Sequence, residues 1–402
     1  MNNQRLLIDW PLTPYTGWGS YGIQLAQALI ANEDAKPVLT YRADRSPHCD
    51  PHWLIKLDEL EAYSHELIKY FDKNPKETVN TNCQVAMGPM GNEIPPLRCL
   101  ANHQIGVTFF ERTTINAQYI ETLEKYRMII TGSHWNQQLL IDSGYQRSEM
   151  IHQGVDTSRF NSIPTQRLLK NEFIIFAGGK LEARKGQDII IAAFREFIKK
   201  CPDALLIACW GNIGNVGLET ISQTPHISGA PKQGNNTEIM EWLGSNGIPG
   251  KNILLAPIMA NSMLANLMKQ ADVAVFTSRC EGGTNLMAME TLACGIPTIL
   301  SANTGHIDLL EMRLEHTIAI GKDGIGKVPQ KITAGYGGDQ GKLWGETDPE
   351  ELAAKWMDIW CEKSKWRTKG IEGAKDFESM SWKSSMQNLT KILKDYEILA
   401  SE

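Results

Sequence analysis

The feature that most constrains the fold is a repeated alternation of short apolar runs with amphipathic helical segments. In the first part of the chain the apolar runs are RLLIDW, CQVAMG, ANHQIGVTFF and YRMIITGS. In the second part they are NEFIIFAGG, DALLIACWG, NILLAPI, DVAVFTS and IPTILS. Such alternation is typical of βαβ units with a parallel sheet. The sequence therefore predicts two α/β domains that face each other across a cleft.

The segment HQGVDTSRFNSIPTQRLLKN separates the two series and has the polar, turn-rich composition of a linker. A chain of 402 residues is long enough for two domains of ordinary size. We predict a first domain over residues 1–165 and a second domain over residues 166–385.

Composition excludes several classes of protein. The net charge of -6 is mild and spread along the chain, which argues against a stable nucleic-acid partner. No apolar run is long enough for a transmembrane segment and no leader is evident, so a cytoplasmic location is expected. The eight cysteines form no C-x-x-C and lie mostly in apolar segments, which predicts reduced, buried thiols.

Two glycine-rich stretches precede helices. Gly17 and Gly19 stand ahead of IQLAQALIA, and a second stretch precedes LMAMETLAC, a helix with stop signals at Gly295 and Pro297. Backbone N–H groups at the start of a helix attract anions, and Asn285 is a suitable N-cap. We expect an anion site at the second stretch, whereas the first is equally explained by a tight turn.

Cationic side chains follow the first strand of the second domain, in GGKLEARKG. Ligands of parallel sheets bind at the carboxyl ends of the strands, so Lys180 and Lys185 are expected to contact phosphate. Arg184 is expected to be a solvated surface charge.

These motifs together resemble glycosyltransferase family four, which consists of retaining enzymes with two Rossmann-like domains (the GT-B fold) that use nucleotide sugars. The resemblance rests on FAGGKLEARKGQDIIIAAF, IHQGVDTSRF, EGGTNLMAMETLACGIPTI and TGHIDLL, and it extends to VTFFERTTI, MIITGSHWNQQLLIDSG, GKLWGETDPEELAAKW and FESMSW. It thus covers most of the chain. It also implies that the C-terminal helix, over residues 386–402, crosses back to the first domain.

The resemblance implies roles for individual residues. Glu281 would contact the donor sugar, Glu290 the nucleotide ribose, and Lys180 and Lys185 the diphosphate. Ile258 lies in a segment expected to face the base. The complete set of expected donor-binding residues is Gly17, Gly19, Lys180, Lys185, Gly282, Gly283, Thr284, Asn285, Leu286, Glu290 and Ile258.

His103 is a further catalytic candidate, beside Glu281 and Glu290, because the family has a sugar-contacting histidine near this position. A histidine packed in the core is the alternative. Glu111 is expected either to orient an acceptor hydroxyl or to cap a structural element, and Ser133 to line the same edge of the cleft.

One departure from the family concerns spacing. The family leaves seven residues between the two glutamates, whereas eight lie between Glu281 and Glu290. Either the loop bulges at Gly282 and Gly283, or Glu281 has left its usual sugar contact.

The expected chemistry needs no metal and no cofactor. Breaking a sugar–phosphate bond leaves negative charge on the diphosphate, which lysines and helix-end amides can stabilise. No Asp-x-Asp occurs in the chain. The stretch HCDPH, residues 48–52, has metal-capable atoms but reads better as a surface loop.

The sequence therefore predicts a retaining, metal-independent hexosyltransferase that acts on a nucleotide-diphosphate sugar and an acceptor hydroxyl. A phosphorylase-like enzyme and a non-catalytic sugar-nucleotide-binding protein stay open as alternatives. The base, the sugar, the acceptor and the oligomeric state are left undetermined, as is the role of the polar stretch over residues 211–238, which reads as a specificity element or a contact surface.

Overall fold

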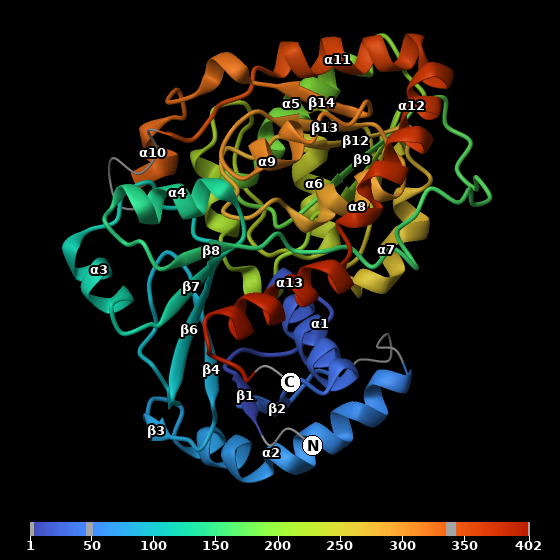
Figure 1. Cartoon of the computed structure of the whole chain (residues 1–402). Coiled ribbons are helices and arrows are strands. Elements are labelled where there is room, and N and C mark those ends of the chain that lie inside the picture. Colours follow the sequence, from blue (N-terminus) through green and yellow to red (C-terminus); the bar gives the residue numbers. More distant parts are fainter. Residues whose placement is uncertain (1–3, 46–50, 335–342, 401–402) are drawn as a thin grey trace.

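A computed structural model describes residues 4–45, 51–334 and 343–400. The chain forms two lobes, each built around a parallel β-sheet that is flanked by helices (Figure 1). The predicted fold class, α/β with two Rossmann-like domains, is confirmed. His48, Cys49 and Asp50 of the HCDPH stretch lie outside the described residues.

The first domain contains a six-stranded sheet in which every neighbouring pair is parallel. In spatial order its strands are β2 (Lys36–Leu39), β1 (Arg5–Ile8), β4 (Val85–Met90), β6 (His103–Thr108), β7 (Met128–Thr131) and β8 (Ser148–Met150). Its helices are α1 (Gly17–Asn32), α2 (Pro51–Lys73), α3 (Ala117–Leu123) and α4 (His134–Asp142). A separate small sheet pairs β3 (Val79–Asn80) with β5 (Cys99–Leu100).

The second domain repeats this plan. In spatial order its strands are β11 (Ile253–Leu255), β10 (Leu205–Cys209), β9 (Ile174–Gly178), β12 (Val273–Phe276), β13 (Thr298–Ser301) and β14 (Thr317–Ile320), all parallel. Its helices are α5 (Gln187–Phe197), α6 (Asn236–Ser245), α7 (Asn261–Met268), α8 (Leu286–Ala293), α9 (His306–Glu311), α10 (Gln330–Thr333), α11 (Pro349–Cys361) and α12 (Lys363–Asp376). Short 3-10 turns lie at Ala183–Lys185, Ile213–Asn215, Leu218–Gln223, Gly250–Asn252, Lys322–Gly324 and Phe377–Ser379.

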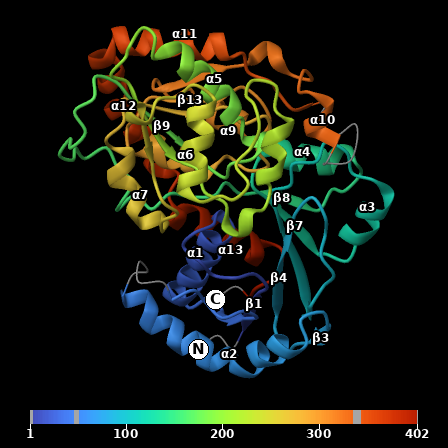
Figure 2. The same ribbon diagram turned by 180° about the vertical axis from the view of Figure 1, so that it is seen from behind.

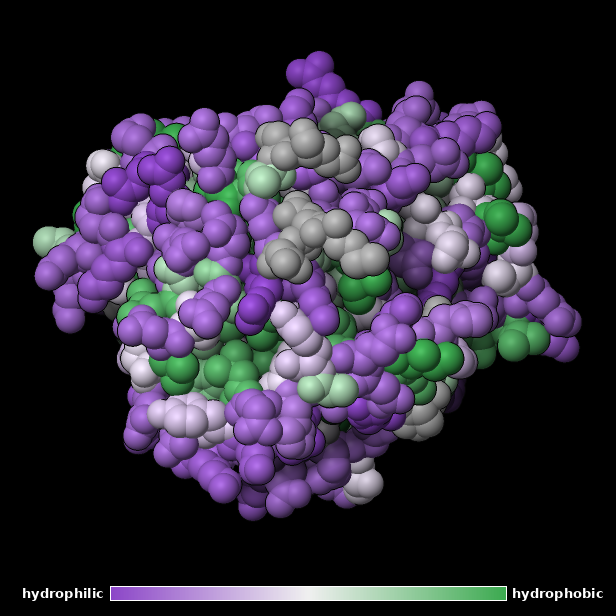
Figure 3. Space-filling view, turned by 60° about the horizontal axis from the view of Figure 1, so that its bottom comes forward, coloured by the Kyte–Doolittle hydropathy of each residue, from purple (hydrophilic) through white to green (hydrophobic). Residues whose placement is uncertain are grey.

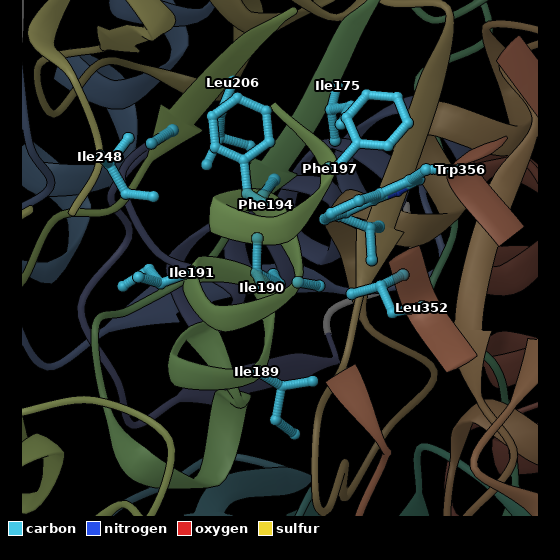
Figure 4. Packing of buried hydrophobic residues seen from close by; sticks show 14 of the residues in the cluster. Ile175, Ile189, Ile190, Ile191, Phe194, Phe197, Leu206, Ile248, Leu352 and Trp356 are labelled. Carbon is cyan, nitrogen blue, oxygen red and sulfur yellow. The ribbon is translucent and has the colours of Figure 1, made fainter. Parts of the chain in front are cut away.

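The core of the second domain shows why these segments form these elements. The apolar residues of α5 are buried between the sheet and α11, where Phe194 and Phe197 stack edge-on against Trp356 (Figure 4). The β-branched run Ile189–Ile191 lies on the same helix and is fully buried. Burial of such side chains contributes about 1.5–3 kcal/mol each, so tertiary packing outweighs their modest helix propensity.

The chain crosses between the lobes twice. Residues 151–173 lead from β8 to β9, and the domain boundary that we propose near residue 165 falls within them. The chain returns before α13 (Trp382–Asp395), which packs against α1 in the core of the first domain (Figures 1 and 2). The two crossings are joined by a parallel bridge between Val155 and Ser381.

The surface is mainly hydrophilic on the face seen in Figure 3, where hydrophobic side chains form separate patches. Among the described helices, none combines the length and the hydropathy that a bilayer-spanning segment needs. The described cysteines are all free thiols, and most of them are buried, as predicted. The polar stretch over residues 211–238 is less loop-like than expected, because it contains two 3-10 turns and the start of α6.

Candidate active site

The candidate site lies where the strand order of the second sheet reverses. The chain enters the sheet at β9, continues to β10 on one side, and later returns to β12 on the other side. Ligands of such sheets bind beyond the carboxyl ends of the strands at this reversal. The loop after β9 carries Lys180 and Lys185, and the loop after β12 carries Glu281 and the glycines. Two of the sequence-predicted segments therefore meet at the position expected for a ligand.

Glu281 is buried in a network of donors. Lys185 Nζ lies 2.7 and 2.8 Å from the two carboxylate oxygens, and Asn285 Nδ2 donates at 2.9 Å. The Ser278 hydroxyl donates at 2.5 Å. Burial alone would raise the pKa of Glu281, but the charges of Lys185 and Arg184 outweigh it and lower the pKa to about 2. Glu281 is therefore a fixed negative charge that holds Lys185 at the mouth of the loop.

Arg184 differs from the sequence-based prediction. Its guanidinium is buried rather than solvated, and it donates to the Cys280 carbonyl at 2.8 Å. It also contacts the carboxylates of Glu182 at 2.5 Å and Glu281 at 3.4 Å. The prediction of a surface charge was wrong because the carboxylates that pair with Arg184 come from separate segments of the chain.

Glu290 has the opposite surroundings. It lies on α8 and is almost fully buried, and Asn261 Nδ2 donates to its Oε1. Within the described part of the chain its Oε2 has no hydrogen-bond partner. Burial raises the pKa of Glu290 to about 8, although the hydrogen bond from Asn261 opposes this rise. A buried oxygen without a partner is costly, so this position is built to receive a donor from outside the chain.

The glycine-rich loop turns at its last residue, just before α8. Asn285 caps α8, its side chain accepting from the Ala288 amide at 3.4 Å, and it takes up φ of 66° in the left-handed region. The loop thus turns at Asn285, whereas neither Gly282 nor Gly283 has a positive φ. Gly282 is needed for a different reason, because a Cβ there would lie 2.1 Å from the carbonyl oxygen of Phe109 in the first domain.

The amides of this loop point to an anion site. Within the described residues, no acceptor is recorded for the backbone N–H groups of Gly282, Gly283 and Thr284. They precede the N-terminus of α8, where the helix dipole favours negative charge. The Thr284 side chain is buried and its hydroxyl contacts the Met289 sulfur, so only the backbone of Thr284 is suited to a ligand.

The first-domain glycines lie inside α1 rather than ahead of it. Thr16 is the N-cap, and its hydroxyl accepts from the Gly19 amide at 3.0 Å. A Cβ on Gly19 would lie 2.2 Å from the Thr13 carbonyl oxygen, so this glycine is required by the turn. Gly17 faces the second domain, where a Cβ would meet Leu286 at 3.4 Å. The structure thus brings Gly17 to the candidate site. Gly19 is explained by the local packing against Thr13 and needs no contact with a ligand.

Two further predicted positions lie at the rim. Lys180 is exposed, and its backbone carbonyl accepts from the Gln187 side chain. Ile258 is 49% exposed and lies against Gly211. A Cβ added to Gly211 would lie 2.4 Å from Cγ1 of Ile258. The segment expected to face the base therefore packs against Gly211, which follows β10.

His103 does not join the other candidates. It is the first residue of β6 and pairs with Val85, the first residue of β4. It therefore lies at the amino edge of the parallel sheet, whereas Gly282 approaches Phe109 just beyond the carboxyl end of β6. Burial lowers the pKa of His103, and the charge of Arg127 adds to this effect. The position favours the structural alternative over a catalytic role.

Glu111 and Ser133 serve the contact between the domains. Glu111 lies 3.4 Å from Arg184 and accepts from the Asn92 side chain at 2.8 Å. Ser133 is the N-cap of α4, and its hydroxyl donates to the Gly282 carbonyl at 2.6 Å. Ser133 thus fixes one edge of the glycine-rich loop, whereas Glu111 connects the first domain to Arg184.

Sequence reasoning missed two residues of the site. Asn261 holds Glu290, and its backbone amide donates to the Pro14 carbonyl of the first domain at 3.0 Å. His306 is buried, and its Nε2 lies 3.3 Å from the side-chain Nδ2 of Asn285. Burial lowers the pKa of His306 to about 4. His306 lies in the quoted motif TGHIDLL, so the signal was present, whereas nothing in the sequence around Asn261 distinguishes it.

Comparison with solved structures supports the fold. The structure is similar to sucrose-phosphate synthase from Thermosynechococcus elongatus, with a TM-score of 0.64, 16% identity and coverage of 98% of this chain and 99% of that one. It is also similar to Anabaena HepE in complex with UDP-glucose, with a TM-score of 0.63, 13% identity and coverage of 98% and 100%. These similarities show that the chain has the two-domain GT-B fold.

The sequence of the second domain carries a family match. Residues 159–322 match the family described as glycosyl transferases group 1. The predicted resemblance to such enzymes is thereby confirmed for this segment.

Two curated relatives share only part of their length with this chain. Mannosylfructose-phosphate synthase of Agrobacterium fabrum is 26% identical over 176 residues, which cover 42% of this chain and 36% of that protein. The putative glycosyltransferase YtcC of Bacillus subtilis is 20% identical over 270 residues, which cover 63% and 60%. This chain therefore spans less than two thirds of the length of both curated relatives.

Proposed function

We propose that this protein transfers a hexose from a nucleotide-diphosphate sugar to an acceptor hydroxyl, with retention of configuration and without a metal. The second domain would hold the donor and the first domain the acceptor. The observation that carries the proposal is the arrangement around α8, where Glu290 has a buried, unpartnered oxygen and the loop amides lie ahead of the same helix.

The geometry supports distinct roles for the loop and for the helix that follows it. A ribose hydroxyl that donates to Glu290 Oε2 would remove the cost of leaving that oxygen buried alone. The diphosphate would accept from the loop amides and from Lys185, whose ammonium lies at the loop beside Glu281. The nucleotide is thereby fixed at its sugar and at its phosphates.

Stabilisation of the leaving group then follows from the same residues. As the sugar–phosphate bond breaks, negative charge grows on the diphosphate, and preorganised donors in a buried site lower the energy of that state. Lys185 and the dipole of α8 supply this stabilisation without a metal. The leaving phosphate oxygen takes the proton of the acceptor hydroxyl on the same face of the sugar, so no protein nucleophile is needed.

The proposal also covers partners and location. Donor and acceptor are the small-molecule partners, no nucleic acid is required, and we propose a cytoplasmic setting. HepE, a structure of the same fold, is described in complex with UDP and with UDP-glucose, which supports trying a uridine nucleotide first.

A thermal-shift panel tests the proposal. UDP-, GDP- and ADP-sugars are added to the wild type and to Glu290→Ala, with EDTA present. A ligand that binds only the folded state raises the melting temperature, so we expect a shift with one base that survives EDTA and shrinks in the variant. No shift with any nucleotide sugar at millimolar concentration would overturn the proposal.

Product analysis separates the remaining alternatives. With the matching donor and an acceptor library, transfer with an unchanged anomeric configuration, read by NMR, supports a retaining transferase. Release of the sugar to inorganic phosphate would identify a phosphorylase. Donor binding with neither transfer nor slow hydrolysis would identify a binding protein.

A further inference from the structure

Three metal-capable side chains from separate segments converge at the contact between the domains. His134 is the first residue of α4, His152 follows β8, and Asp308 lies in the first turn of α9. His134 Nδ1 lies 3.1 Å and His152 Nε2 lies 2.7 Å from the same oxygen, Asp308 Oδ2. The candidate ligand atoms of all three residues lie within 4.8 Å of one another. One carboxylate oxygen of the second domain thus lies near two imidazole nitrogens of the first domain, one from α4 and one from the segment after β8.

These separations are close to those of a metal site. Two ligands of a tetrahedral zinc ion lie about 3.4 Å apart, given bond lengths of about 2.1 Å. The separation of 3.1 Å would have to widen by about 0.3 Å and that of 2.7 Å by about 0.7 Å to reach this value, which side-chain rotation can supply. The two imidazole rings are inclined at 74° with centroids 5.7 Å apart, so both can point their nitrogens at a common centre.

The cluster also has a graded exposure. The side chain of Asp308 is 3% exposed, that of His152 is 22% exposed and that of His134 is 61% exposed. An ion can therefore enter from the His134 side and keep a water molecule there as a fourth ligand. The backbone amide of His134 donates to Asp308 Oδ2 at 2.9 Å and fixes the orientation of the carboxylate, as outer-shell donors do in metal sites.

We propose that His134, His152 and Asp308 form a Zn²⁺ site that joins the two domains. Two imidazole nitrogens and one carboxylate oxygen suit Zn²⁺, whereas Mg²⁺ and Ca²⁺ prefer oxygen ligands alone. On binding, each imidazole presents a lone pair to the ion and keeps its single proton on its other ring nitrogen. The site uses none of the residues proposed to hold the donor, so zinc binding and metal-independent transfer are separate properties.

Zinc bound at this position would act on the glycine-rich loop through two neighbouring residues. Ser133 precedes His134 and donates to the Gly282 carbonyl, and His306 begins α9 and lies beside Asn285. Zinc bound between α4 and α9 would hold both neighbours against the glycine-rich loop. Binding would therefore favour the arrangement of the two lobes seen here.

Direct zinc titration tests the proposal on the untagged full chain after treatment with EDTA and dialysis. ZnCl₂ is titrated against a chromophoric competitor, and bound zinc is counted by mass spectrometry after gel filtration. We expect one Zn²⁺ per wild-type chain. His134→Ala and Asp308→Asn should lower the affinity at least about tenfold, because even the loss of an outer-shell partner has an effect of that size.

Matched variants keep the test decisive. His65 is an exposed histidine on α2, 3.9 Å from Glu66, so His65→Ala should bind zinc like the wild type. Cys49→Ser tests the HCDPH stretch as a competing source of ligands and should also bind one Zn²⁺. His134 is largely exposed, so His134→Ala should fold even if Asp308→Asn does not.

The melting temperature supplies a second readout. Zn²⁺ should raise it in the wild type but not in His134→Ala, and Mg²⁺ should raise it in neither. Unchanged zinc affinity in His134→Ala, or loss of the stoichiometric ion in Cys49→Ser, would overturn the proposal. The absence of saturable binding to the wild type would do the same. None of these outcomes depends on transferase activity.

Discussion

Glu281 begins the glycine-rich loop and Glu290 lies on α8, the helix that follows it; both are buried, but their surroundings are opposite. Glu281 is surrounded by Lys185, Arg184 and polar donors, which lower its pKa to about 2. Glu290 has one amide partner and an unpartnered oxygen, and burial raises its pKa to about 8. One carboxyl group is thus satisfied by the chain itself, while the other is left for a ligand. A buried charge with its partners organises a site, whereas a buried group without them marks where the ligand is expected.

The largest effect should come from removing the satisfied carboxylate. Glu281→Ala leaves Lys185 and Arg184 partly or fully buried without their shared partner, and breaking a buried ion pair in this way costs about 3–5 kcal/mol of unfolding free energy. Urea unfolding at pH 7 measures this loss. Because the folded pKa lies below the usual value, the contribution is present above about pH 4.5 and fades as the pH falls toward 2.

An exposed ion pair provides the control for that loss. Glu124 lies 2.6 Å from Arg147, and both side chains are about half exposed. Glu124→Ala should cost less than about 1 kcal/mol, as exposed pairs do. Equal losses in the two variants would show that the network around Glu281 is not specially stabilising.

The unsatisfied carboxyl group should behave in the opposite way. In the folded protein Glu290 stays protonated up to about pH 8, while in the unfolded chain it ionises above about pH 4.5, so folding opposes ionisation between these values. Glu290→Gln is free of this penalty and should be more stable than the wild type by about 3 kcal/mol at pH 7. Thermal unfolding from pH 4 to pH 8 measures the difference, which should vanish near pH 4.5. A gap that does not depend on pH would contradict the raised pKa.

The effect of Lys185 on ligand affinity tests the proposed role of the network around Glu281. Lys185→Met removes a cation that we propose binds the diphosphate, so nucleotide-diphosphate affinity should fall about 10–100-fold, or about 1.4–2.7 kcal/mol. Isothermal titration with the nucleotide from the thermal-shift panel measures this change. Lys180→Met, at an exposed position in the same loop, should have a smaller effect. The reverse order would place the diphosphate at Lys180.

The smallest effect is expected at His103. Because it lies at the amino edge of the first sheet, His103→Ala should change the donor-induced rise in melting temperature by no more than the error of the measurement. Its own effect on stability should stay below about 0.5 kcal/mol, as for other partly exposed positions. Loss of the donor-induced shift would return His103 to the active site.

Much of the fold could be predicted from the sequence because periodicity reports burial directly. Runs such as NEFIIFAGG and DVAVFTS became β9 and β12 in a fully parallel sheet, and the stop signals at Gly295 and Pro297 lie just beyond the end of α8. The start of α1 was harder to predict from the sequence. Glycine has low helix propensity, yet Thr16 supplies a cap, and α1 therefore includes Gly17 and Gly19.

The candidate site was predictable only where its residues follow one strand directly. Lys185 and Glu281 follow β9 and β12, so topology alone brings them together. Arg184 was misread because its burial depends on carboxylates in three segments, Glu182, Glu111 and Glu281. The role of His103 could not be predicted from the apolar run alone, because such a run does not reveal which of its ends faces the ligand.

The bridge between Val155 and Ser381 has a mechanical consequence. The amide of Val155 donates to the Met380 carbonyl at 2.9 Å, and the amide of Trp382 donates to the Val155 carbonyl at 3.2 Å. The two segments that connect the lobes are therefore hydrogen-bonded to each other where they pass from one lobe to the other. Such a joint resists independent bending of either connecting segment, so a rotation of one lobe relative to the other would have to move both segments together.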